Sequence, residues 1–119
     1  MISRYSRKEL VNIWSEENKY KIWLEVEIAA AEAMEKYKII PRGVASIVKK
    51  KGKIKVKRIH DIEAKVKHDV IAFLTSITEQ TGIKARYLHQ GMTSSDVLDT
   101  SFNIQLVQSG NILLKDIDN

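Results

Sequence analysis

A run of apolar residues between positions 22 and 37 constrains the fold of this chain more than any other feature. The positions are Ile22, Trp23, Val26, Ala29, Ala30, Ala33, Met34 and Tyr37. They recur every three or four residues, which places their side chains on one face of an α-helix. The segment Ser15-Glu16-Glu17 precedes them as a typical helix start. We therefore predict a long amphipathic helix that ends before Pro41, with Trp23 in the core.

Turn-forming residues are scarce in the whole chain. The 119 residues include only 5 Gly and 1 Pro, which favours long helices over many short strands. The segment from Lys53 to Lys57 alternates like a strand, but no other segment alternates in a way that would pair with it. The sequence therefore predicts an all-α fold.

Two short helices are predicted around the long one. Ser6 and Glu9 have the spacing of a capping box, in which each side chain bonds the backbone N–H of the other residue. A short helix is expected to begin with Pro41-Arg42-Gly43 and to break at Gly52.

The second half of the chain predicts further helices. Apolar residues return to helical spacing from Lys57 to Thr81, as two helices or as one helix kinked at His68-Asp69. A last helix starts with Ser94 or Ser95 as its N-cap and continues towards residue 119.

Composition excludes several classes of protein. There is no Cys, so neither a disulfide framework nor a thiolate metal site is possible, and a reducing cytoplasm is compatible. The chain starts without the apolar stretch of a signal peptide, and no apolar run approaches the roughly 18 residues of a membrane helix. We therefore expect a cytoplasmic protein without a membrane partner.

The net charge of +5 comes from one short segment. Seven of the ten residues from Lys49 to Arg58 are Lys or Arg, and the rest of the chain holds 13 basic against 15 acidic residues. A solvated loop explains this run, and a general nucleic-acid-binding surface is not implied. One alternative stays open, a small basic helical module that binds nucleic acid through this segment.

Two polar segments suggest a binding site. The first runs from Tyr87 to Thr100, where Gly91 permits a tight turn and the segment Thr93-Ser94-Ser95 opens a helix. Hydroxyls and free N–H groups at a helix start suit a carboxylate or phosphate, although the same residues also fit an ordinary helix cap. The second segment is Lys67-His68-Asp69, which interrupts an apolar-periodic stretch.

The order of these and other motifs resembles the N-terminal part of the adenylosuccinate lyase family, within the fumarase/aspartase superfamily. The matching segments are, in chain order, Arg4-Tyr5-Ser6, Ile13-Trp14, Trp23 to Glu27, Ile40-Pro41, Ile59 to Glu63, His68 to Phe73, His89 to Thr100 and Ile112 to Asp116. The resemblance implies β-elimination of fumarate from adenylosuccinate, giving AMP, and from a succinylated aminoimidazole carboxamide ribotide. It implies no metal and no organic cofactor, and a homotetramer whose active sites are shared by three subunits.

The resemblance also implies roles for individual residues. Arg4 and Tyr5 match a pair that contacts the nucleotide end of the substrate. The segment Lys67-His68-Asp69 matches a basic-His-Asp element, in which His68 would hydrogen-bond substrate and support catalysis. Asp69 would fix the tautomer of His68 or cap the next helix. The remaining matches are Thr93 and Ser94, which bind a substrate carboxylate, and His89, which lies near the same pocket.

By the same resemblance, the main catalytic acid and base lie outside these 119 residues. Residues 1–93 would form an N-terminal helical domain, and residues 94–119 the start of a long helix of a central bundle. The chain alone is expected to be inactive. A helical self-association domain is another alternative, because the last helix carries an apolar stripe, which consists of Leu98, Phe102, Leu106, Leu113 and Ile117.

Overall fold

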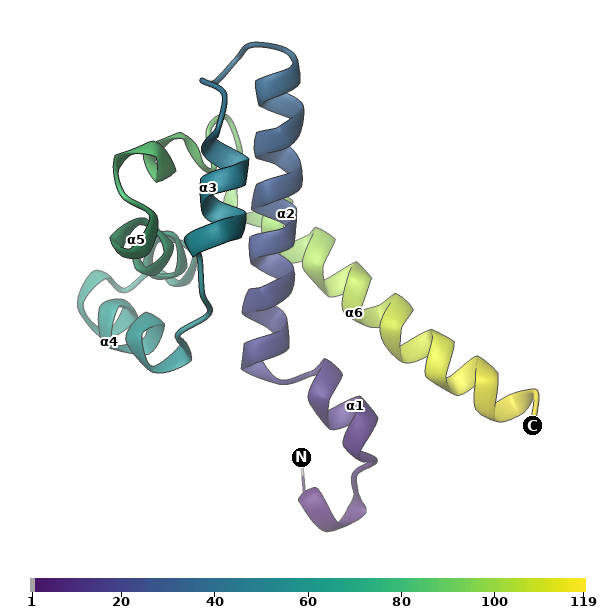
Figure 1. Cartoon of the computed structure of the whole chain (residues 1–119). Helices are drawn as coiled ribbons and strands as arrows, with labels where there is room; N and C mark the ends of the chain where they lie inside the picture. The colour runs from purple at the N-terminus through teal and green to yellow at the C-terminus, as the bar shows by residue number, and fades with distance from the viewer. Residues whose placement is uncertain (1) are drawn as a thin grey trace.

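The computed structural model describes residues 2–119, apart from the side chain of Ser3, and within them it contains helices and no strand (Figure 1). Two short 3-10 turns are η1 (Ser3–Tyr5) and η2 (Ile83–Tyr87). The α-helices are α1 (Lys8–Ile13), α2 (Glu16–Lys36), α3 (Val44–Lys51), α4 (Val56–Val66), α5 (Asp69–Thr81) and α6 (Ser94–Ile117). The predicted all-α fold is confirmed.

Helix α2 lies at the centre of the molecule and contacts α1, α3, α4 and α6. Figure 1 shows α3, α4 and α5 gathered on one side of α2, while α6 leaves α2 in the opposite direction. Helix α1 lies against both α2 and α6. The C-terminal half of α6 extends beyond α2 and is held by the α1 region, where Trp14 donates to Ser109 at 3.0 Å and Arg7 pairs with Asp116. The molecule measures 48 × 34 × 24 Å.

Three aromatic side chains form the centre of the core. Trp23 is 1% exposed, as its place on the apolar stripe predicts, and its ring stands perpendicular to that of Phe73 with centroids 5.5 Å apart. Tyr20 stacks on Phe73 with centroids 6.0 Å apart. Burial is the main cause that raises the pKa of Tyr20 to about 12. These rings hold α2 against α5.

The helix starts agree with the sequence only in part. Helix α2 begins where the sequence predicts a helix start, and Ser15 is its N-cap, since the Ser15 side chain accepts from the N–H of Asn18 at 3.2 Å. The predicted capping box at Ser6 is wrong, because its hydroxyl donates to the carbonyl of Ile2 at 2.7 Å within the preceding turn. Helix α1 instead begins after Arg7 without a side-chain cap.

The start of α6 also differs from the prediction. Thr93, and not Ser94 or Ser95, is the N-cap, because its backbone is extended while Ser94 is already helical. The Asp96 carboxylate accepts from the Thr93 N–H at 2.9 Å, which closes a capping box.

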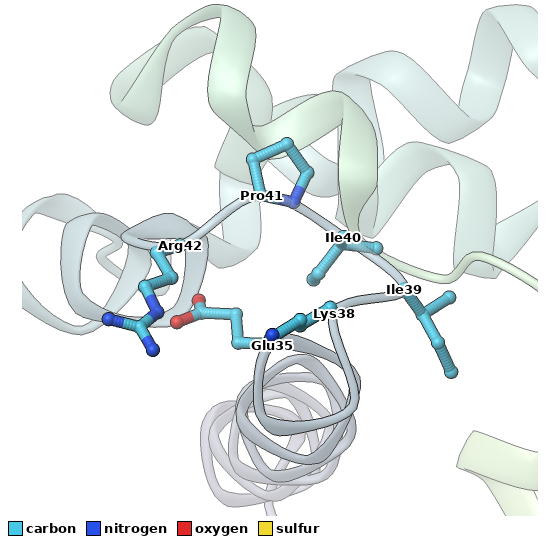
Figure 2. Close-up of a pocket in the computed structure, with 6 residues that line it drawn as sticks. All are labelled: Glu35, Lys38, Ile39, Ile40, Pro41 and Arg42. Atoms are coloured by element: carbon cyan, nitrogen blue, oxygen red, sulfur yellow. The ribbon is translucent and has the colours of Figure 1, made fainter.

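The start of α3 is capped from another helix. Gly43, with φ of 93°, precedes α3, and the Glu35 carboxylate at the end of α2 accepts from the N–H groups of Ala45 at 2.7 Å and Gly43 at 3.2 Å. These backbone hydrogen bonds, that of Ala45 above all, lower the pKa of Glu35. Figure 2 shows this carboxylate in a shallow hollow beside Pro41 and Arg42. The hollow is therefore a structural joint between α2 and α3.

Candidate functional site

A sharp turn connects η2 to α6 and carries several of the predicted site residues. His89 has a φ of 62° and Gly91 a φ of 69°, so two residues within three positions adopt the left-handed conformation. The backbone N–H of Met92 donates to the carbonyl of His89 at 3.4 Å, which closes the turn. The turn therefore lies directly before α6, and His89 is five positions before the first residue of that helix.

His89 is held by a buried carboxylate of α2. The backbone N–H of His89 donates to Glu27 Oε2 at 3.0 Å, and its ring Nδ1 lies 2.5 Å from Glu27 Oε1. The Glu27 side chain is fully buried, while that of His89 is 18% exposed. The two residues are 62 positions apart, so this contact ties the turn before α6 to the central helix.

Sequence reasoning did not single out Glu27. It lies four residues after Trp23 and four before Ala31, on the buried face of α2. A charged residue in register with an apolar stripe is the signal that marks it, because a buried carboxylate requires a partner.

The start of α6 offers donors to an anion. The first N–H groups of a helix have no acceptor within it, and the helix dipole favours negative charge there. The Asp96 carboxylate already takes the N–H of Thr93, so an anion would use the next N–H groups and the hydroxyls of Thr93 and Ser94. Thr93 is exposed and Ser94 half-buried.

The second predicted element forms the joint between α4 and α5. Lys67 ends α4 with a φ of 57°, and His68 is the N-cap of α5. The His68 Nδ1 accepts from the N–H of Ile71 at 3.2 Å, so a neutral His68 ring carries its proton on Nε2. The sequence left two alternatives open here, two helices or one kinked helix, and the structure has two helices.

Asp69 neither fixes the tautomer of His68 nor is the N-cap of α5, the two roles expected for it. His68 itself caps α5, and the bond from Ile71 decides its tautomer. The Asp69 carboxylate lies 3.7 Å from His68 Nδ1 and accepts from the N–H of Val70 at 2.7 Å. Its negative charge complements the start of α5.

Arg4 and Tyr5 lie in η1 at the beginning of the described chain. The Arg4 guanidinium stands 4.8 Å from the centre of the Tyr5 ring, and Tyr5 is 75% exposed. Within residues 2–119, no hydrogen bond or ion pair joins η1, the α4–α5 joint and the turn before α6. Each of the three elements is held by its own contacts.

The basic segment is partly neutralised by the protein itself. Lys49 forms an ion pair with Glu32, and Arg58 binds both carboxylate oxygens of Glu79, at 3.0 and 2.5 Å. The hydrogen bonds of the second pair raise the pKa of Arg58 and lower the pKa of Glu79. Part of this charge therefore connects α4 to α5.

The described residues do not form other obvious kinds of site. Residues 2–119 contain no group of three His, Asp or Glu side chains that could hold a metal ion. No helix in this part of the chain has both the length and the apolar content needed to cross a membrane.

The sequence of the chain is similar to those of known enzymes. No protein-family model matches the chain. Adenylosuccinate lyases do: the chain is 44% identical to that of Streptococcus mutans, 45% to that of Synechocystis and 41% to that of Bacillus subtilis. These alignments include 99–100% of the chain.

Over almost its whole length, the chain is therefore similar to a part of the adenylosuccinate lyases. The family resemblance found in the ordered motifs is thereby confirmed. The chain spans only 27–28% of the length of these curated relatives.

A solved structure shows the same fold. The crystal structure of a fumarate lyase from Mesorhizobium sp. BNC1 matches with a TM-score of 0.84 and 21% identity. The match covers 96% of this chain and 29% of that protein. The arrangement of α1 to α6 is therefore also found in a part of that lyase.

Proposed function

We propose that this chain is the N-terminal part of an adenylosuccinate lyase. In this proposal the whole enzyme cleaves adenylosuccinate to AMP and fumarate, and releases fumarate from the succinylated aminoimidazole carboxamide ribotide, by β-elimination. The observation that carries the proposal is the identity of 41–45% to adenylosuccinate lyases over essentially the entire chain. The chain's part in the reaction is to hold the substrate.

The three local elements have complementary chemistry for such a substrate. We assign the hydroxyls of Thr93 and Ser94, with the free N–H groups of α6, to a carboxylate of the succinyl group. Arg4 and Tyr5 are exposed and suit the nucleotide end, where a guanidinium binds phosphate. His89 completes the turn beside this carboxylate site.

The joint between α4 and α5 has a supporting role in catalysis in this proposal. His68 is 42% exposed at its side chain, and its neutral ring has an N–H on Nε2 that is able to donate to substrate. Lys67 adds a positive charge next to it, and Asp69 balances that charge at the start of α5.

The main acid and base lie outside these 119 residues in this proposal, so the chain alone is inactive. No metal or organic cofactor takes part, and the enzyme works in the cytoplasm. We further propose that the whole enzyme is a homotetramer. Support for an oligomer comes from apolar side chains of α6 that face solvent, because such a stripe normally packs against other helices. They are Phe102 at 51%, Leu106 at 46%, Leu113 at 50% and Ile117 at 80% exposure.

The proposal is tested by isolating the polypeptide that carries this sequence in its source cells with an antibody against the chain. We expect a mass several times larger than 13.6 kDa and release of fumarate when adenylosuccinate is added. The 119-residue chain, expressed alone, serves as the control and should release none. A native product of 13.6 kDa, or a larger one without lyase activity on either substrate, would contradict the proposal.

A further inference from the structure

We infer that Glu27 is a positioning residue, which fixes the ring of His89 so that Nε2 faces the nucleotide substrate as a hydrogen-bond acceptor. The inference rests on the proposed function for the identity of the substrate. It rests on the contacts of Glu27 for the orientation of the ring.

Glu27 is buried with His89 as its hydrogen-bond partner. Its side chain has no exposed surface, and both of its oxygens bind His89, one at the backbone N–H and one at the ring. An ionised carboxylate is costly to bury unless its lone pairs are satisfied. In the described part of the chain, His89 supplies both donors.

The contact with Glu27 also fixes the tautomer of His89. An ionised carboxylate only accepts hydrogen bonds, so the Nδ1 that lies 2.5 Å from Glu27 Oε1 carries a proton. In the neutral ring, Nε2 then has a free lone pair. Because Glu27 occupies Nδ1, Nε2 is the ring nitrogen left to bind a ligand, and the His89 side chain is 18% exposed.

The backbone of His89 has a left-handed conformation. A φ of 62° is unfavourable for a residue with a Cβ atom and persists where surrounding contacts impose it. The bond from the His89 N–H to Glu27 Oε2 is such a contact. Glu27 therefore fixes the backbone and the ring of the same residue.

The chemistry of the substrate fits this arrangement. The turn from His89 leads within five residues to Ser94, where the helix start offers donors to an anion. An unprotonated imidazole nitrogen instead accepts from an O–H or N–H group. A nucleotide joined to a dicarboxylate has both kinds of group, since it carries ribose hydroxyls and an N–H as well as carboxylates.

The test is the Glu27→Gln variant of the longer polypeptide. The glutamine carbonyl still accepts from the His89 N–H, but its NH₂ group donates to Nδ1, so the proton of the neutral ring moves to Nε2. We expect kcat/KM for fumarate release to fall about 10–100-fold with unchanged thermal unfolding. Nitrogen NMR of the labelled ring should show the proton on Nδ1 in the wild type and on Nε2 in the variant.

Two further variants separate positioning from a general loss of structure. Glu25→Gln removes the same charge from an exposed position of α2 and should leave both readouts unchanged. Glu27→Asp keeps an acceptor at the ring and should retain the Nδ1 proton and more activity than Glu27→Gln.

Several outcomes would overturn the inference. One is full activity of Glu27→Gln. Another is a wild-type His89 ring that is protonated on Nε2 or on both nitrogens at pH 8. The third is a Glu27→Asp variant with no more activity than Glu27→Gln. If Glu27→Gln does not fold, the wild-type ring and Glu27→Asp decide. If the wild type releases no fumarate, the proposed function fails, while the NMR result still decides the role of Glu27.

Discussion

The two histidines of the candidate site are held in opposite ways. His89 is mostly buried, and its Nδ1 meets a carboxylate from a helix 62 residues away in sequence. His68 is 42% exposed, and its Nδ1 accepts a backbone N–H only three residues away. One ring therefore presents an acceptor and the other a donor. The comparison shows that a distant contact and a local cap can set the tautomer of the same side chain differently.

The largest expected difference between the two histidines is in stability. His89→Ala leaves the buried Glu27 carboxylate without its partner and should cost about 3 kcal/mol. His68→Ala removes only a helix cap and should cost about 1 kcal/mol. Urea unfolding of the two variants measures both values, and equal losses would contradict this comparison.

The next effect separates capping from chemistry at His68. His68→Asn keeps a good N-cap but removes the imidazole, so kcat of the longer polypeptide should fall about 100-fold or more while its thermal unfolding stays unchanged. Fumarate release and a melting curve on the same preparation test this. His60→Asn, on the exposed side of α4, is the control. A matched fall in both variants would remove His68 from the reaction.

Glu35 extends the comparison to a second carboxylate that acts at a distance. Its folded pKa lies below the ordinary value of 4.5, so its contribution to stability is present above pH 4.5 and is lost as the pH falls through the folded pKa. We expect Glu35→Gln to cost about 1 kcal/mol at pH 7 and much less in acid. Unfolding at several pH values checks this, and a pH-independent difference would argue against the cap.

The smallest effect belongs to the surface ion pair between Lys49 and Glu32. Both side chains are more than half exposed, so Lys49→Ala should change the free energy of unfolding by no more than about 0.5 kcal/mol. Chemical unfolding at low and high salt tests this. A loss as large as that of His89→Ala would mean that exposed and buried pairs do not differ here.

Much of the fold follows from the sequence alone. The stripe around Trp23 and the cap at Ser15 predict α2, and the scarcity of Gly and Pro predicts the all-α class. The sequence predicts the other helix caps less well, because Ser6 and Ser94 also fit neighbouring turns. Only the folded structure shows that the Ser6 hydroxyl donates to the carbonyl of Ile2 and that Thr93 precedes the helix.

The sequence predicts less of the candidate site than of the fold. The ordered motifs indicated the family correctly, and the comparisons confirm it. The roles of Arg4, His68 and Ser94 stay predictions. Glu27 was missed because its partner lies 62 positions away, and only the fold brings the two together.

The most direct test of the central claim is the rate of fumarate release from adenylosuccinate by the longer polypeptide, measured for the wild type and for Glu27→Gln. We expect an enzyme-like rate for the wild type and a rate about 10–100-fold lower for the folded variant. No fumarate from the wild type would contradict the proposed function. Equal rates for both proteins would contradict the role of Glu27 and of the ring that it holds.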